Sequence, residues 1–271
     1  MVEAMVHDWR ESNLAERIAQ SSVIAFDLDN TLACSRKPMV PEIASVLSKL
    51  INIMPVAIIT GGSLELVKSQ VIDVLKNNTC LTHLHIMPTN GTSYYRIDSY
   101  GILRCVYEHK IDETRAKYVI SVMRDCAKNM GLLKMPGDSN LWGEQIEYRG
   151  SQITFSALGQ LAPLESKKAW DPTGKLQSEL TAMVAEALPD FAVRAGGETS
   201  VDVVSRGDNK AEALNSLAQS FEVDICSITF IGDRMTPEGN DYPTCLTGAL
   251  AVKVSNPSDT LELCKKVLAF L

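Results

Sequence analysis

The stretch that most constrains the fold is 23–32, which reads Val-Ile-Ala-Phe-Asp-Leu-Asp-Asn-Thr-Leu. Four apolar residues that run into a polar turn are typical of a buried strand in a parallel sheet. In open α/β sheets, ligands bind beyond the carboxyl ends of the strands. Asp27 and Asp29 follow this strand, and extended geometry would point both side chains the same way. Two close carboxylates are costly without a positive charge between them, so the pattern predicts a divalent cation with oxygen ligands.

An ordinary polar turn after a strand would also explain the stretch 27–31 taken alone, so other strand ends are needed to decide. A second apolar strand, 55–59, is followed by Thr60-Gly61-Gly62-Ser63 and a helical stretch. This strand, glycine turn and helix order is typical of a βαβ unit, and the helix N-terminus would favour an anion. Thr60 or Ser63 could instead cap the helix. If Ser63 is the cap, Thr60 is left for a ligand.

Composition excludes several classes of function. The chain has 271 residues with a net charge of −7, which gives no sign of the basic patch expected for nucleic-acid binding. No apolar run approaches the roughly 18 residues of a membrane span, and the first residues lack the pattern of a signal peptide. The seven cysteines are scattered and contain no Cys-x-x-Cys pair. Reduced thiols in a cytoplasmic protein are therefore expected.

The chain is expected to have an α/β architecture with an inserted α+β domain. A helix is predicted over 8–20 and a hairpin over 94–107, whereas His83 and His85 are expected to serve packing rather than metal binding. From 108 onward the alternating βα pattern stops: helices are predicted at 113–130 and 174–188, and strands at 145–148, 152–156, 191–194 and 200–204. The predicted division is 1–107 and 205–271 for a parallel-sheet core, and 108–204 for the insertion.

The last part of the chain completes a set of polar groups at predicted strand ends. Lys210 begins a predicted helix, the strand 225–231 ends in Gly232-Asp233, and Gly239-Asn240-Asp241 follows. Together with Asp27, Asp29 and Thr60, these carboxylates, the hydroxyl and the ammonium suit phosphoryl transfer. One carboxylate can attack phosphorus, and a second can protonate the leaving oxygen.

This set, in this order, resembles the haloacid dehalogenase (HAD) superfamily of phosphohydrolases from about residue 23 to the end. The resemblance implies a Rossmann-like core, Asp27 as nucleophile and Asp29 as general acid/base. It implies phosphate binding by Thr60, Gly61 and Lys210. It also implies Mg²⁺ held by Asp27, the Asp29 backbone carbonyl and Asp233, with Asn240 and Asp241 as outer partners.

Further motifs resemble eukaryotic phosphomannomutases, in which a cap domain binds the sugar phosphate. They are Phe-Asp-Leu-Asp-Asn-Thr-Leu with Arg36, Ile-Glu-Tyr-Arg ending at Arg149, Gly-Gly-Glu-Thr-Ser-Val-Asp over 196–202, and Pro-Glu-Gly-Asn-Asp over 237–241. The resemblance implies that Arg36 and Arg149 meet phosphate or sugar, and that Ser200 and Asp202 meet sugar hydroxyls. Asn30 replaces the family's glycine in a turn that tolerates asparagine.

The sequence departs from that family where the cap should hold a second phosphate. Further arginines of the cap correspond here to positions near Gln160 and Lys167. A mutase must hold one phosphate while the other reacts, and neither glutamine nor lysine reproduces the planar fork of arginine. The departure favours hydrolysis of a monophosphate, although Lys167 and Lys168 could still supply charge.

Three hypotheses follow. The first is a Mg²⁺-dependent phosphatase acting on a small phosphorylated sugar. The second is a phosphomannomutase with a bisphosphorylated activator. The third is a binder of sugar phosphates without catalysis, which the complete set of carboxylates and Lys210 disfavours. A monomer or a homodimer through the cap is expected by analogy, and the sequence assigns no role to residues 1–20.

Overall fold

The computed structural model describes residues 5–75, 77–207 and 209–271, which form two compact units. The core unit comprises the described residues up to Glu108 and from Asn209 onward, and the inserted unit comprises those between them. In the described part of the chain, no helix combines the length and apolar character needed to cross a membrane.

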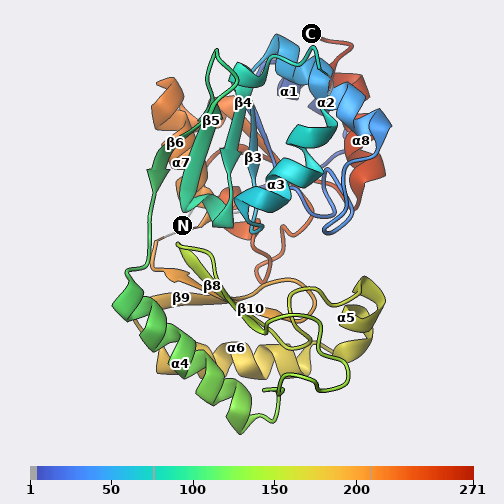
Figure 1. Cartoon of the computed structure of the whole chain (residues 1–271). Helices are drawn as coiled ribbons and strands as arrows, with labels where there is room; N and C mark the ends of the chain where they lie inside the picture. The colour runs from blue at the N-terminus through green and yellow to red at the C-terminus, as the bar shows by residue number, and fades with distance from the viewer. Residues whose placement is uncertain (1–4, 76, 208) are drawn as a thin grey trace. The chain divides into compact units, whose positions relative to one another are not determined.

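The core unit is built on an eight-stranded sheet in the order β1-β12-β11-β2-β3-β4-β5-β6 (Figure 1). The strands from β1 to β4 in this order are parallel, and β5 and β6 form an antiparallel hairpin at the edge. Their bounds are β1 Val6–Asp8, β2 Val23–Phe26, β3 Val56–Ile59, β4 Leu84–Met87, β5 Ser93–Ile97, β6 Leu103–Glu108, β11 Ile228–Gly232 and β12 Leu250–Lys253. The mostly parallel α/β core predicted from the sequence is confirmed.

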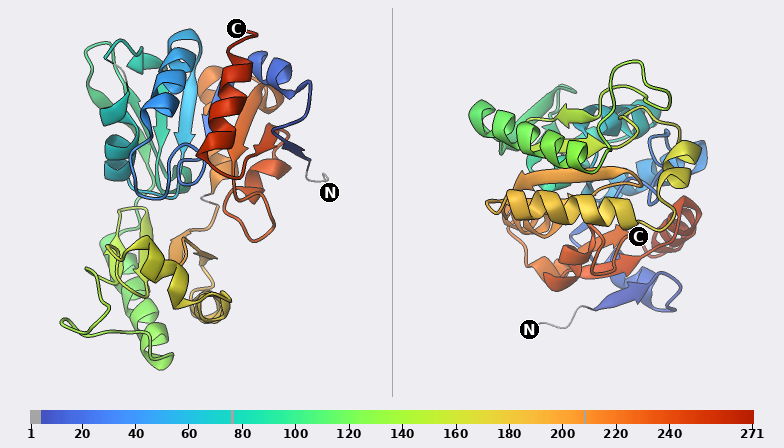
Figure 2. Two further views of the ribbon diagram at one scale, coloured as in Figure 1. Left: turned by 90° about the vertical axis from the view of Figure 1, so that its right-hand side faces the viewer. Right: turned by 90° about the horizontal axis from the view of Figure 1, so that it is seen from below.

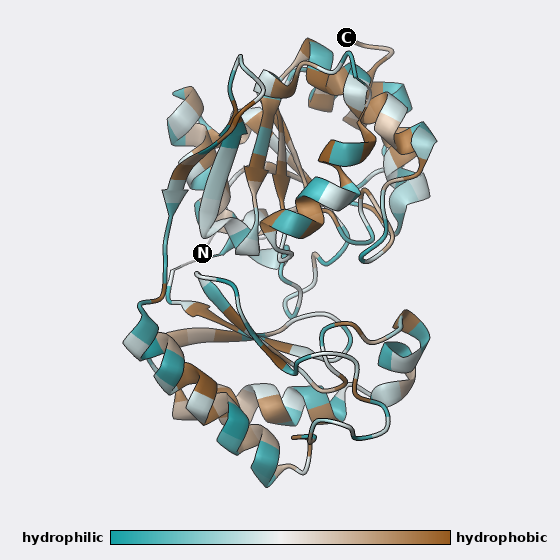
Figure 3. Ribbon diagram, viewed as in Figure 1, coloured by the Kyte–Doolittle hydropathy of each residue, from teal (hydrophilic) through white to brown (hydrophobic). Residues whose placement is uncertain are grey.

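Helices cover both faces of this sheet because its central strands are apolar on both sides (Figures 1 and 3). Alternate residues of β2 belong to different hydrophobic clusters. Ile24 and Phe26 lie in the cluster on one face of the sheet, and Val23 and Ala25 lie in the cluster on the other face. The first layer contains α1 Leu14–Ala19, α2 Pro41–Ile53, α3 Leu64–Gln70 and α8 Pro257–Val267, and the second contains α7 Lys210–Phe221.

The inserted unit is a four-stranded antiparallel sheet with two helices on one face (Figure 2). Its strand order is β7-β8-β10-β9, with β7 Ile146–Tyr148, β8 Gln152–Ser156, β9 Phe191–Ala195 and β10 Ser200–Ser205. Ile153 and Val201 pack beneath α4 Glu113–Asn129 and α6 Lys175–Ala187. The intervening residues, such as Thr154 and Asp202, therefore point to the opposite, polar face.

The structure corrects the predicted helix over 8–20. Residues 6–8 form β1 at the sheet edge, and α1 begins only at Leu14. The backbone N–H of Arg10 donates to the Asp8 side chain (3.0 Å), and the Glu11 side chain accepts from the Asp8 N–H (3.0 Å). Such local bonds offer the backbone an alternative to the helix. A second difference is α5, Leu164–Trp170, which lies between the predicted strand 152–156 and the predicted helix 174–188, where no helix is predicted.

Candidate active site

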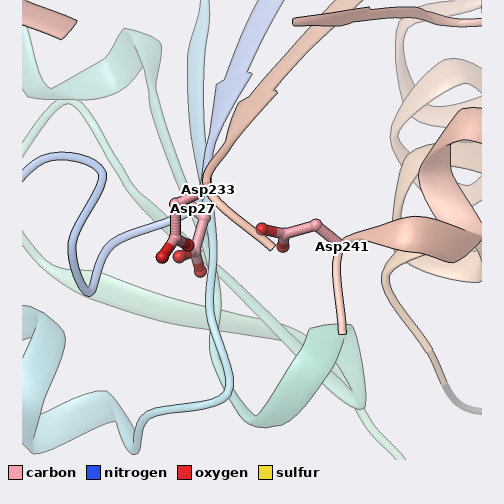
Figure 4. A group of neighbouring side chains, drawn as sticks. All are labelled: Asp27, Asp233 and Asp241. Carbon is pink, nitrogen blue, oxygen red and sulfur yellow. The ribbon is translucent and has the colours of Figure 1, made fainter. Parts of the chain in front are cut away.

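Three carboxylates converge at the carboxyl ends of two neighbouring parallel strands. Asp27 directly follows β2, Asp233 directly follows β11, and Asp241 returns from the next loop. One oxygen of each lies within 4.8 Å of the others (Figure 4). Asp27 and Asp233 lie beside each other and Asp241 reaches toward them. Adjacent parallel strands end at the same edge, which brings together residues about 200 positions apart in sequence.

Lys210 joins this group from the first turn of α7. Its ammonium Nζ lies 2.5 Å from Oδ1 of Asp27 and 2.7 Å from Oδ1 of Asp241. Asn209 caps the helix by accepting from the N–H groups of Ala211 and Glu212. Burial alone would lower the pKa of Lys210, but the carboxylates of Asp241 and Asp27 outweigh it and raise the pKa above its ordinary value. The ammonium therefore stays charged although it is fully buried.

The site carries more negative than positive charge. Burial is the largest cause that raises the pKa of Asp27 to about 8; Lys210 opposes it, and Asp241 and Asp233 reinforce it. Burial and then Asp241 raise the pKa of Asp233 to about 6. Three carboxylates share one ammonium here, so a further cation would let all of them ionise at neutral pH.

The residues present fit a hard divalent cation. Asp233 Oδ1 and Asn240 Oδ1 are buried and have no hydrogen-bond partner among the described residues. Buried acceptors of this kind are normally satisfied, and an ion would satisfy them. The group offers only oxygen atoms, which Mg²⁺ prefers. Asp241 differs, since its two oxygens accept from Lys210 and from the Arg234 N–H (2.9 Å), which suits an outer position.

Two glycines make the return of Asp241 possible. A Cβ added at Gly232 would lie 2.5 Å from Asp241 Oδ2, and one at Gly239 would lie 1.9 Å from the Arg234 carbonyl oxygen. Neither position has room for a side chain without movement of the loop. The Gly-Asp and Gly-Asn-Asp motifs are therefore needed to place the third carboxylate.

The turn after β3 places Thr60 at the same edge of the sheet. Thr60 is buried, and its Oγ1 accepts from the Gly62 N–H (3.0 Å). The Ser63 side chain caps α3 by accepting from the Leu66 N–H (3.4 Å), so the cap is Ser63 and not Thr60. At Gly61, an added Cβ would approach the Asn240 side chain to 3.8 Å, which shows how close this turn lies to the acidic group.

Asp29 is not part of the carboxylate group, and the extended geometry that would point its side chain with that of Asp27 does not persist. Strand β2 ends at Phe26, and the chain turns, with the N–H groups of Leu32 and Ala33 donating to the Leu28 carbonyl oxygen. Alternation by two residues therefore does not persist. Asp29 Oδ1 instead accepts from the Arg36 N–H (3.0 Å) and from Gln70 Nε2 (3.3 Å).

Arg36 and Gln70 thus surround Asp29 in different ways. Arg36 is exposed, has a positive φ of 58°, and meets Asp29 through its backbone. Gln70 is buried at the end of α3, and sequence reasoning missed it because nothing in a helical stretch marks one glutamine as a partner of a distant carboxylate.

The polar face of the inserted sheet gathers Arg149, Ser200 and Asp202. Asp202 Oδ1 accepts from Thr154 Oγ1 (2.7 Å), and the Ser200 and Ser156 hydroxyls share a hydrogen bond of 2.8 Å. Burial raises the pKa of Asp202, with Arg149 as the largest opposing influence.

Arg149 is held by neighbours on this face. Its guanidinium pairs with Glu147 (2.6 Å) and donates to Gln160 Oε1 (3.3 Å). Arg194 of β9, which the sequence analysis did not single out, stands directly across from Asp202 in the strand register. Periodicity along β9 shows only that Arg194 lies on the polar face, because the residues that alternate with it belong to the apolar cluster. Its position opposite Asp202 follows from the pairing of β9 with β10.

Comparisons with known proteins agree with this geometry. The model of the eukaryotic phosphomannomutase family matches residues 43–270. The spinach (Spinacia oleracea) phosphomannomutase is 26% identical over 256 residues, covering 92% of this chain and 97% of the relative. Human phosphomannomutase 1 is 25% identical over 260 residues, covering 93% of this chain and 94% of the relative.

A solved structure shows the same fold. The C-terminally truncated IMP-nucleotidase of Plasmodium falciparum aligns with a TM-score of 0.71 at 18% identity, covering 96% of this chain and 74% of that structure. The fold is that of the HAD-type phosphatases, as the sequence motifs implied. Since the family model spans most of the chain, this protein belongs to the eukaryotic phosphomannomutase family.

Proposed function

We propose that this protein is a Mg²⁺-dependent phosphohydrolase that acts on a small phosphorylated sugar through an aspartyl-phosphate intermediate. The observation that carries the proposal is the buried contact of Lys210 with Asp27 and Asp241 beside Asp233. Lys210 orients the nucleophile by its Oδ1 and leaves Oδ2 to attack phosphorus. A buried ammonium in this position also offsets charge that develops on the transferring group.

The proposed reaction has two steps. Asp27 Oδ2 bonds to phosphorus, the bond from phosphorus to the sugar oxygen breaks, and Asp29 gives that oxygen a proton. Water then attacks the phosphorus of the aspartyl phosphate and gives its proton to Asp29, which frees phosphate and restores both carboxyl groups. Thr60, Gly61 and Lys210 would bind the phosphoryl oxygens during both steps.

The cation would be held by Asp27, Asp233 and the Asp29 backbone carbonyl, with Asn240 and Asp241 outside. When bound, it supplies positive charge that neutralises the carboxylates and polarises the phosphoryl oxygen. The unsatisfied oxygen of Asp233 supports its assignment as a direct ligand.

The polar face of the inserted sheet favours hydrolysis over isomerisation. Among the described residues of this face, the two arginines Arg149 and Arg194 lie among two acidic residues, Glu147 and Asp202, so their formal charges balance. Gln160 stands where the phosphomannomutase resemblance expects an arginine, and it accepts from Arg149. A mutase must bind its second phosphate firmly, and these contacts leave little positive charge to do so. We propose that the inserted unit is a cap that orients a sugar through Arg149, Ser200 and Asp202, and that Arg36 of the core unit meets phosphate or sugar.

Phosphomannomutase activity is the second candidate, because the relatives carry that name and because Lys167 of α5 could add charge. Phosphate release from a panel of sugar monophosphates with Mg²⁺, measured beside isomer formation with a sugar bisphosphate, separates the two. The phosphatase proposal expects release without isomerisation. It fails if Asp27→Asn releases phosphate as fast as the unmodified protein.

A further inference from the structure

Gln70 makes three hydrogen bonds that tie the end of α3 to the loop after β2. Its side-chain Nε2 donates to Asp29 Oδ1 (3.3 Å) and to the Lys37 carbonyl oxygen (3.0 Å). Its own carbonyl oxygen accepts from the Met39 N–H (3.0 Å). All of these residues lie in the core unit, so the contacts do not depend on the inserted unit.

The orientation of the Gln70 amide follows from its partners. A carboxylate oxygen and a carbonyl oxygen both accept hydrogen bonds, so the amide nitrogen must face them. The other end of the amide is left without a partner: Oε1 is buried and unbonded within the described residues. An unsatisfied buried acceptor is unfavourable, and sequences accept such violations mainly at functional sites.

These bonds fix one edge of the Asp29 carboxyl group. Oδ1 accepts from both Gln70 Nε2 and the Arg36 N–H, whereas no described residue bonds to Oδ2. A carboxyl group held by one oxygen presents the other in a fixed direction. Proton transfer requires the proton donor within hydrogen-bond reach of the leaving oxygen, so a fixed direction accelerates that step.

We propose that Gln70 is a positioning residue, which holds the Asp29 carboxyl group so that Oδ2 delivers the proton to the leaving oxygen. This inference rests on the proposed function, because it assumes that Asp29 is the general acid. In that step the bond between phosphorus and the leaving oxygen breaks, that oxygen takes the Asp29 proton, and Asp27 carries the phosphoryl group. Gln70 acts through Asp29 and touches no reacting atom.

The test uses aryl phosphates of similar shape whose phenols differ in acidity, such as 4-nitrophenyl, 4-chlorophenyl and phenyl phosphate. An acidic phenol leaves without help, whereas a weakly acidic one needs the proton. The quantity measured is kcat/KM with Mg²⁺, since it reports on the steps up to departure of the phenol. In Gln70→Met, we expect phenyl phosphate to lose roughly tenfold, part of the roughly 10²–10⁴-fold that a general acid supplies. The 4-nitrophenyl substrate should change less than about twofold on the same argument.

Matched variants separate positioning from a general structural effect. Ser69→Ala is the control, because this neighbouring side chain is exposed and, among the residues that the structure describes, bonds only to the Leu66 carbonyl oxygen (3.1 Å). It should leave every substrate unchanged. In Asp29→Ala, kcat/KM should depend on the acidity of the phenol more steeply than it does in Gln70→Met. Adding Gln70→Met to Asp29→Ala should then change nothing further, because the group to be positioned is gone.

The outcomes distinguish two kinds of failure. If Asp27→Asn hydrolyses these esters as well as the unmodified protein does, the proposed function itself is wrong. If Asp29→Ala steepens the dependence but Gln70→Met lowers all substrates equally, the positioning role alone is overturned. Equal losses from Gln70→Met in the presence and absence of Asp29 would overturn it as well. Should Gln70→Met not fold, Gln70→Glu keeps the size, removes the donor and must show the same selective loss.

Discussion

The acidic site of the core unit and the polar face of the inserted sheet use similar residues in opposite ways. In the core, Asp27, Asp233 and Asp241 surround one ammonium, which leaves negative charge and unsatisfied oxygens. On the inserted sheet, each predicted residue has a neighbour that satisfies it: Arg149 with Glu147, Ser200 with Ser156, and Asp202 with Thr154. Under the proposed function, the core would carry out chemistry with a cation and a phosphate, and the sheet face would recognise the sugar.

The largest expected difference is in the rate of phosphate release, when an aspartate is replaced by asparagine in one region or the other. Asp27→Asn removes the proposed nucleophile and should lower phosphate release about 10⁴-fold or more, the scale on which catalytic nucleophiles act. Asp202→Asn keeps the shape of a residue whose proposed role is to contact the sugar, so it should raise KM and lower kcat less than about tenfold. Steady-state phosphate release checks both. A larger loss of kcat in Asp202→Asn than in Asp27→Asn would reverse the comparison.

The free energy of unfolding should also change unequally when a positively charged side chain is removed from the core site or from the inserted unit. Lys210→Met leaves two buried carboxylates uncompensated, and breaking such a buried pair costs about 3–5 kcal/mol. Lys175→Met removes the partner of Glu179 in an exposed pair on α6 of the inserted unit, where an ion pair contributes about 1 kcal/mol or less. Urea unfolding followed by circular dichroism compares the two variants. Equal losses would mean that the core charges are better hydrated than their burial indicates.

Mg²⁺ should stabilise the folded protein by binding at the core site, and this stabilisation should depend on Asp233. Binding to the folded state at a concentration of about 100 times Kd adds about 2.7 kcal/mol of stability. Thermal melting with Mg²⁺ and with a chelator should show a shift in the unmodified protein and in Asp202→Asn, but not in Asp233→Asn. An unchanged shift in Asp233→Asn would remove this residue from the cation site.

Acid should destabilise the core unit through a histidine away from the site. Burial, more than Arg96 and His83, lowers the pKa of His85 to about 4, and its ring bonds to the Tyr94 hydroxyl at 2.6 Å. The unfolded chain, with an ordinary pKa near 6.5, takes up the proton first as the pH falls. The contribution of His85 is therefore complete above about pH 6.5 and about 2 kcal/mol smaller at pH 5. Unfolding in urea at pH 7 and pH 5 should show this loss, and His85→Gln should lack it. The same loss in His85→Gln would assign it to other groups.

Sequence reasoning located the parts of the site that follow directly from chain order. Asp27 and Asp233 come immediately after buried strands, so parallel pairing alone brings them together, and Lys210 begins the helix that packs on this sheet. The sequence did not place the Asp29 side chain, because the strand ends one residue before Asp27 and the chain then turns. Local hydrogen bonds of this kind have no periodic signature.

Contacts between distant elements were the other part that escaped prediction. Gln70 reaches Asp29 across 41 positions, and Arg194 meets Asp202 only through the pairing of β9 with β10. At the N-terminus, β1 completes the edge of the sheet by pairing with β12, which is far away in sequence. Each depends on tertiary register, whereas periodicity reports only the face on which a residue lies.

The most direct test of the account is ³¹P NMR of the protein with mannose 1-phosphate, Mg²⁺ and a sugar bisphosphate, followed in one tube. It reports phosphate and the isomeric sugar phosphate at the same time. The account predicts that inorganic phosphate accumulates while the isomer does not, because the formal charges of the described residues on the polar face of the inserted sheet balance. Isomer that accumulates faster than phosphate would contradict it and show that this face holds a second phosphate.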